Sequence, residues 1–238
     1  MEQITIGNIK IDVVCKHIKN IHLGVYPPTG RVRIAAPLKM KEDAIRLFAI
    51  SKLSWIKRNQ RKFEVQERVT SREYKQRESH YFRGRRYLLR IVETEASLKV
   101  LLKNKTYIDL YIRPGASTKK RHEIITEWYR AELREQIPAI IAKWEEILDI
   151  KVNAWQVKQI KTKWGSCNIE NKRILINLEL AKKPEHCLEY IIVHEMVHFL
   201  ERHHKDKFLY YMDTYLPNWK KIKTELNKLP ASHADWNY

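Results

Sequence analysis

The residues best able to do chemistry lie close together at positions 194–198, where the sequence reads H-E-M-V-H. This segment sits in an apolar run with helical spacing. His194 and His198 therefore stand about one turn apart on one helix face, and their imidazoles can reach one ion. Glu195 is placed to act on a water molecule beside that ion. Imidazole ligands, an open coordination position and a carboxylate that accepts a proton are what a zinc hydrolase requires.

The helix around this pentad is expected to be buried. Pro184 suits its first turn, where a missing N–H is no loss, and the apolar positions that follow are Cys187, Leu188, Ile191, Ile192, Val193, Val197 and Leu200. Two histidines inside such a helix need either hydrogen-bond partners or a metal. A pair of hydrogen-bonded core histidines is the alternative interpretation, and the pentad favours the metal.

Catalytic zinc usually takes three protein ligands and a water molecule, so a third ligand is needed. We expect His204, which lies six residues after His198, the offset of the third histidine in the H-E-x-x-H-x-x-G-x-x-H pattern of metzincins. In that pattern a glycine turns the chain back toward the metal, whereas Glu201 stands here. His203 and Glu225 remain alternatives. The prediction is one Zn²⁺ per chain.

The composition is that of an ordinary globular protein, with 238 residues and 44% hydrophobic residues. No run approaches the ~18–20 apolar residues that span a bilayer, and the first residues lack the pattern of a signal peptide. The three cysteines are scattered, which argues against a disulfide framework. We therefore expect a cytoplasmic location and no membrane partner.

The net charge of +18 indicates a partner that carries negative charge. Many of the cations fall between residues 57 and 90: Lys57, Arg58, Arg61, Lys62, Arg68, Arg72, Lys75, Arg77, Arg83, Arg85, Arg86 and Arg90. Aromatic residues interleave with them, as on surfaces that bind nucleic acid. Nucleic acid or a nucleotide is thus one predicted partner, and a merely solvated basic face is the alternative.

The order of the expected elements predicts an α+β fold. Residues 1–116 are expected to form an N-terminal domain rich in antiparallel strands, with one amphipathic helix at about 40–63 and a charged connector at 64–79. Its strands are expected at 4–6, 11–15, 22–26, 32–34, 87–92, 98–102 and 107–112. The turns between the first strands are expected at Gly7-Asn8 and at 27–30.

Residues 117–230 are expected to form a metal-binding catalytic domain, zincin-like and mainly helical with a short β-sheet. Ser117 is a suitable cap for a helix over 118–148, which Pro138 should kink or split. A strand pair is expected at 155–163 and 173–178, around a turn region that contains Gly165. The pentad helix, a turn at His203-His204 and two further helices follow, and 231–238 is expected to be a loose tail.

With these pieces in order, nearly the whole chain resembles the YgjP-like family of predicted metallopeptidases. The R-W-G-S-C signature of that family appears at 163–167 as K-W-G-S-C, with Lys163 in place of the usual arginine. Its I-x-x-N-x-x-L segment is residues 174–180, including Asn177. Its H-E-L-x-H-L-x-x-x-N-H-S block is residues 194–205, with His203 for asparagine and Lys205 for serine.

The resemblance implies a zinc-dependent hydrolase of the zincin type, with His194, His198 and His204 as ligands and Glu195 as catalyst. It also implies kinship with SprT-like proteases, which act on DNA-bound proteins. The expected substrate is a peptide or an unfolded protein segment. Two other functions remain open. One is a pyrophosphatase-like hydrolase of nucleotide phosphoanhydrides that uses the same site, and the other is a DNA-associated protease or binding protein.

Further site residues are less constrained by the sequence. Trp164 and Cys167 either line the substrate or belong to a structural turn. The developing oxyanion needs a partner besides the metal, and His203, Tyr210 or Tyr211 are the residues considered for it.

Overall fold

The computed structural model describes residues 2–26, 29–65, 72–160 and 163–228, and in this part of the chain helices and small sheets form an α+β fold, as predicted. The fold divides into two compact units, one holding residues 2–65 and the other the described residues from 72 to 228. The expected tail at 231–238, the middle of the charged connector and the turn at 27–28 lie outside the described residues.

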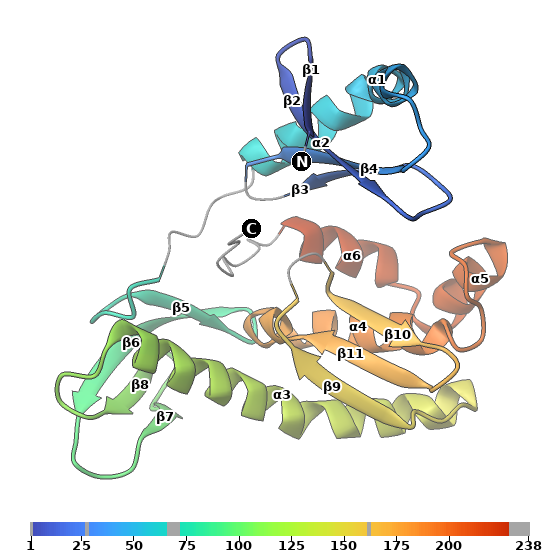
Figure 1. Cartoon of the computed structure of the whole chain (residues 1–238). Coiled ribbons are helices and arrows are strands. Elements are labelled where there is room, and N and C mark those ends of the chain that lie inside the picture. The colour runs from blue at the N-terminus through green and yellow to red at the C-terminus, as the bar shows by residue number, and fades with distance from the viewer. Residues whose placement is uncertain (1, 27–28, 66–71, 161–162, 229–238) are drawn as a thin grey trace. The chain divides into compact units, whose positions relative to one another are not determined.

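The first unit is built on a four-stranded sheet (Figure 1). Its strands are β1 (Glu2–Ile6), β2 (Ile9–Lys16), β3 (His22–Tyr26) and β4 (Arg31–Pro37), in the order β1-β2-β4-β3. The expected positions are confirmed, but the sheet is mixed rather than antiparallel because β2 and β4 run parallel. After β2 the chain forms the far edge strand β3 and then returns between the two as β4, which gives β4 the direction of β2.

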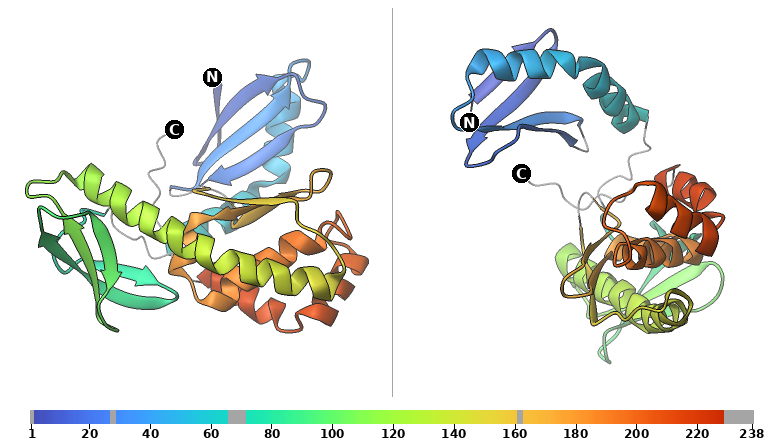
Figure 2. Two further views of the ribbon diagram at one scale, coloured as in Figure 1. Left: turned by 90° about the horizontal axis from the view of Figure 1, so that it is seen from below. Right: turned by 90° about the vertical axis from the view of Figure 1, so that its right-hand side faces the viewer.

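Two helices cover one face of this sheet (Figure 2). They are α1 (Glu42–Ser51) and α2 (Leu53–Val65), where the sequence predicted a single helix over 40–63. The break falls at Lys52, whose φ of −104° and ψ of 4° depart from helical values. The helices pack on the sheet through a small core of Ile4, Ile9, Ile11, Val13, Val32, Ile34, Ala36, Ile45, Ala49 and Ile56.

The second unit begins with another four-stranded sheet. Its strands are β5 (Ser79–Phe82), β6 (Arg85–Glu93), β7 (Lys99–Leu102) and β8 (Tyr107–Ile112), in the order β5-β6-β8-β7. The sequence placed these strands in an N-terminal domain ending at residue 116, and the structure differs. Their inward residues share one core with the helix that follows, so the compact units divide in the charged connector instead.

That helix, α3 (Thr118–Leu148), runs past both sheets of the second unit (Figure 1). Its N-terminus is capped as predicted, because the Ser117 hydroxyl accepts a hydrogen bond from the Lys120 N–H at 3.2 Å. Pro138 does not split this helix, which has 31 residues in total. Tyr129 ties the helix to the first sheet of this unit by donating its hydroxyl hydrogen to the Tyr81 carbonyl at 2.8 Å.

The remaining strands form a three-stranded sheet of β9 (Ala154–Lys158), β10 (Gly165–Asn168) and β11 (Arg173–Asn177), in the order β10-β11-β9. Two of the strands were expected. The third, β10, begins at Gly165, which the sequence placed in a turn region. Because β10 pairs antiparallel with β11 alone among the described strands, its other edge is open.

Four helical segments complete the described part of this unit: η1 (Leu178–Lys182), α4 (Glu185–Val197), α5 (Asp206–Tyr215) and α6 (Trp219–Lys228). Helix α4 carries the pentad and is buried along most of its length, as its apolar sequence predicts. None of the described helices has the length and apolar character needed to cross a bilayer.

Candidate metal centre

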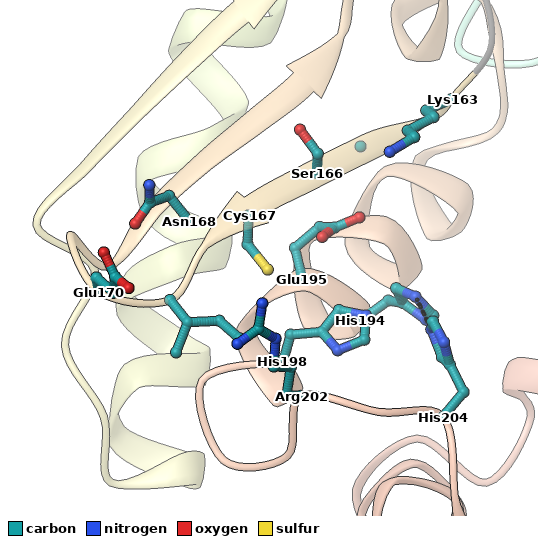
Figure 3. Close-up of a pocket in the computed structure, with 12 residues that line it drawn as sticks. Lys163, Ser166, Cys167, Asn168, Glu170, His194, Glu195, His198, Arg202 and His204 are labelled. Carbon is teal, nitrogen blue, oxygen red and sulfur yellow. Dashed lines mark hydrogen bonds between the residues drawn. The ribbon is translucent and has the colours of Figure 1, made fainter. Parts of the chain in front are cut away.

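Three imidazoles meet at the C-terminal end of α4. His194 lies in the last turn of the helix, His198 is its C-cap residue, and His204 lies in the turn before α5. Their ligand nitrogens all lie within 4.8 Å of one another, and the Nε2 atoms of His194 and His204 are 3.0 Å apart. Figure 3 shows the rings turned toward one another. The structure thus brings together the three histidines that the sequence singled out.

The spacing of these nitrogens suits a tetrahedral metal ion. Zn–N bonds of ~2.0–2.1 Å at tetrahedral angles place two nitrogens about 3.3 Å apart, and the 3.0 Å between the Nε2 atoms of His194 and His204 is close to that value. The two alternatives for the third ligand, Glu225 and His203, do not belong to this group of ligand atoms in the described part of the chain. The Glu225 carboxylate instead contacts the His186 Nε2 at 2.8 Å. Among the described residues, the ligand atoms that lie close together belong to His194, His198 and His204, and His203 is not one of this group.

The three imidazole rings pack against the ring of Phe208 in α5, a residue with 1% exposure. Its ring centroid lies 5.0, 4.8 and 4.6 Å from the centroids of His194, His198 and His204. His198 is further fixed by its Nδ1–H, which donates to the Glu201 carbonyl at 3.2 Å. This bond leaves Nε2 of His198 as the unprotonated nitrogen, as a metal ligand requires.

Burial favours the neutral imidazole at all three positions. It lowers the pKa of His194 to about 3, with smaller contributions from His198 and His204. Burial is also the main cause of the lowered pKa of His198 and of His204. Since neutral imidazole is the form that binds metal, the cluster is preorganised for a cation at neutral pH.

Glu195 lies beside the cluster on the buried side of the cleft, with 6% exposure. Burial raises the pKa of its carboxyl to about 7, partly offset by a hydrogen bond with the Cys167 thiol and by the charge of Lys163. A carboxyl group with a pKa near the working pH can both accept and return a proton. Burial and the neighbouring Glu195 in turn raise the pKa of Cys167 to about 12, so this thiol stays protonated and is a poor thiolate nucleophile or ligand.

Strand β10 passes unusually close to Glu195 at Gly165. A Cβ atom at this position would lie 2.9 Å from the Glu195 Oε1 and 2.8 Å from the Ile191 Cγ2. Carbon atoms normally approach to ~3.5–4.0 Å. The glycine is therefore needed for close packing of the strand on α4, and it sets the position of the carboxylate.

A cleft of about 590 Å³ opens above these groups, and β10 forms one wall of it (Figure 3). The cleft is lined by Lys163, Gly165, Ser166, Cys167, Asn168, Ile169, Glu170, His194, Glu195, His198, Arg202 and His204. Cys167 thus faces the cleft.

Four other residues considered from the sequence do not line this cleft in the described part of the chain. Trp164 packs on the main core, with the Lys183 ammonium 5.5 Å from its ring centroid. Tyr210 is 66% exposed, and Tyr211 stacks with Tyr215 at a centroid distance of 6.2 Å. His203 is exposed, and its N–H donates to the Glu201 side chain at 3.2 Å.

Asn177 is a positioning residue that the sequence analysis noted only as part of a motif. Its side-chain amide donates to the carbonyls of Ile160 and Lys163 at 2.8 and 2.7 Å, and its Oδ1 accepts from the Glu179 N–H at 3.1 Å. The side chain is buried, with 4% exposure. It therefore holds the backbone of Lys163 at the entrance to β10. A buried asparagine that ends a strand is the signal that could have identified it.

A family model described as "YgjP-like, metallopeptidase domain" matches residues 19–229. The chain belongs to this family. It therefore carries a metallopeptidase domain, as the motifs predicted. No curated protein matches the chain.

Two solved structures share a limited resemblance with this YgjP-like protein. One is the metallopeptidase zymogen abylysin of Pyrococcus abyssi, with 16% identity, a TM-score of 0.36, and coverage of 38% of this chain and 90% of the other. The second is the metallopeptidase zymogen jannalysin of Methanocaldococcus jannaschii, with 25% identity, a TM-score of 0.35, and coverage of 38% and 92%.

Proposed function

We propose that this protein is a zinc-dependent peptidase in which His194, His198 and His204 hold one zinc ion and Glu195 transfers protons. The observation that carries the proposal is the convergence of three neutral imidazoles beside a buried carboxyl group, at the floor of an open cleft. Three nitrogen ligands leave a tetrahedral ion one position for water or substrate, which is the arrangement of a catalytic rather than a structural zinc site.

The chemistry divides between the metal and the chain. Zinc at such a site supplies Lewis acidity, which polarises a peptide carbonyl and makes water a stronger nucleophile at neutral pH. Glu195 accepts a proton from the attacking water and then delivers it to the leaving amine. Phe208 and the Glu201 carbonyl keep the imidazoles in place throughout. An extended peptide can reach the site along the open edge of β10.

Hydrolysis of a nucleotide phosphoanhydride at the same site is the alternative, and family membership favours the peptidase. Assays with casein and with a nucleoside triphosphate, each with and without a chelator, distinguish the two. Chelator-sensitive release of phosphate without any cleavage of casein would reject the peptidase proposal.

Two variants test the assigned roles separately. Glu195→Gln should keep one zinc ion per chain and lose peptide hydrolysis by about 10²–10⁴-fold, the usual contribution of a general base. His204→Ala should lower the zinc content sharply, and His203→Ala is its matched control because the neighbouring imidazole lies outside the cluster. Wild-type activity in Glu195→Gln, or full zinc occupancy in His204→Ala, would remove that residue from the proposed site.

A further inference from the structure

In the described part of the chain, two cations that face the proposed reaction cleft have no carboxylate partner. Lys163 precedes β10, and Arg202 lies in the turn after α4, and both line the cleft. Figure 3 places them on opposite sides of Glu195. Among the described residues, no carboxylate lies within ion-pair distance of either side chain, although many other cations of the chain form such pairs. Their charge is therefore available to a ligand in the cleft.

We infer that the cleft selects peptides that carry acidic side chains close to the scissile bond, on both sides of it. This inference rests on the proposed peptidase function and adds a substrate class to it. Carboxylates of the cleft itself oppose the two cations only weakly. Glu195 is buried, with 6% exposure, and Glu170 is exposed at the far end of β10. An acidic peptide supplies the missing counter-charges.

The direction of the peptide assigns each cation to one side of the scissile bond. Strand β10 runs from Gly165 to Asn168 and exposes one edge. A peptide that extends the sheet in the antiparallel sense, which gives the better hydrogen-bond geometry, runs from the Asn168 end to the Gly165 end. Its C-terminal, leaving-group side then lies near Lys163, and its N-terminal, acyl side lies toward Arg202 (Figure 3).

The two cations are placed with different rigidity. The backbone carbonyl of Lys163 accepts a hydrogen bond from the Asn177 amide at 2.7 Å. The backbone from which the Lys163 side chain extends is therefore fixed in position. Arg202 follows Glu201, whose carbonyl holds His198, and its planar guanidinium can bind a carboxylate through two parallel hydrogen bonds. Acidic side chains should therefore be favoured on both sides, through separate contacts.

Three synthetic peptides that differ only beside one scissile bond test the inference with the full-length, zinc-loaded protein. One carries alanine on both sides, one carries aspartate on the leaving-group side, and one carries aspartate on the acyl side. For the wild type, kcat/KM should be about two- to fivefold higher for each acidic peptide than for the neutral one, the range expected of exposed ion pairs. The preference should shrink as salt rises.

Charge reversal then separates the two contacts. Lys163→Glu should abolish the preference for aspartate on the leaving-group side alone, and Arg202→Glu should abolish it on the acyl side alone. Ratios between peptides cancel any general loss of activity in each variant. Arg134→Glu is the matched control, because Arg134 is an exposed cation of α3 outside the cleft, and it should keep both preferences.

The outcomes distinguish this inference from the proposed function. Chelator-sensitive cleavage of all three peptides at equal kcat/KM would support the peptidase and overturn the acidic preference. If Lys163→Glu abolished the preference on the acyl side, and Arg202→Glu abolished it on the leaving-group side, the assigned direction of the peptide would be overturned. No cleavage of any peptide, with the two variants altering only hydrolysis of a nucleoside triphosphate, would overturn both proposals.

Discussion

Replacement of Gly165 by alanine is a direct test of how closely β10 must approach the catalytic helix. The added Cβ would lie 2.8 Å from the Ile191 Cγ2 and 2.9 Å from the Glu195 Oε1. Normal carbon contacts are ~3.5–4.0 Å, so the strand and the helix must separate by several tenths of an ångström. Ile191 has 5% exposure and is packed in the core, so it cannot simply turn away. The displacement therefore falls on β10 and on the Glu195 side chain.

The expected size of the effect follows from this overlap. Overpacking of a core costs about 1–3 kcal/mol, and in a unit of this size each kcal/mol lowers Tm by about 2–4 °C. Activity should suffer more than stability because the carboxylate that transfers the proton moves. Misplacement of a catalytic group by about 1 Å can cost about 10²-fold, so a smaller shift should reduce kcat/KM by about tenfold or more.

The assay compares kcat/KM, zinc content and Tm in Gly165→Ala and in a glycine control. Gly115 has a φ of +71° and open space around its missing Cβ. Gly115→Ala should therefore cost about 1 kcal/mol of backbone strain and leave kcat/KM unchanged. Zinc content should stay at one ion per chain in both. Wild-type kcat/KM and Tm in Gly165→Ala would refute the reasoning, since they would mean that the strand and Glu195 accommodate the methyl group freely.

Three further predictions concern residues around the site and in the core. Phe208→Leu should raise the zinc dissociation constant by about tenfold, measured by competition with a chromophoric chelator, because three imidazoles lose their aromatic support; an unchanged constant would contradict this. Asn177→Ala should lower the free energy of unfolding by about 2–4 kcal/mol in urea titrations, since buried partners lose their hydrogen bonds; a loss below about 0.5 kcal/mol would show that the amide is dispensable. Burial lowers the pKa of His80 from 6.5 to about 3, so the unfolded chain takes up a proton below pH 6.5 while the folded protein does not. His80 should then cost about 2 kcal/mol of stability between pH 6.5 and 5, and His80→Gln should show a correspondingly flatter decline over that range.

The local parts of the site could be predicted from the sequence. The spacing of His194 and His198 depends only on helical periodicity, and the helix itself is evident from its apolar residues and Pro184. His204 was selected by its offset and by the number of ligands that zinc requires, and it lies in the cluster. The alternation of apolar residues likewise predicted the described strands of both units except β5 and β10, which the sequence analysis did not expect as strands.

Contacts that join distant elements could not be predicted in this way. The support of the imidazoles by Phe208 requires α4, α5 and the turn between them to meet, and the role of Gly165 depends on the distance between β10 and α4. The boundary between the units was missed for the same reason. Strands β5–β8 have the same apolar alternation as the first four, and only their packing on α3 shows to which unit they belong.

The basic segment at residues 57–90 illustrates a similar limit. Composition indicated one cationic surface, but several of these residues are paired with carboxylates: Arg72 with Glu78, Lys75 with Glu73, Arg83 with Glu132 and Glu185, and Arg90 with Asp109. The other described cations of this segment are divided between the two units. Net charge therefore overstates the cationic surface that this segment offers, whereas Lys163 and Arg202 of the cleft lie outside the segment.

The turn that brings His204 to the cluster shows how the chain replaces a glycine. At the end of helix α4, the hydrogen bonds span three residues instead of four. The N–H groups of Phe199 and Leu200 donate to the Met196 and Val197 carbonyls, each at 2.9 Å. No described residue between 198 and 205 has a positive φ, so the reversal needs no left-handed residue. Glu201 contributes instead, because its carbonyl accepts from His198 and its carboxylate accepts from the His203 N–H. One residue thus orients one imidazole and shapes the turn that delivers another, which is why an offset of six residues can be kept without glycine.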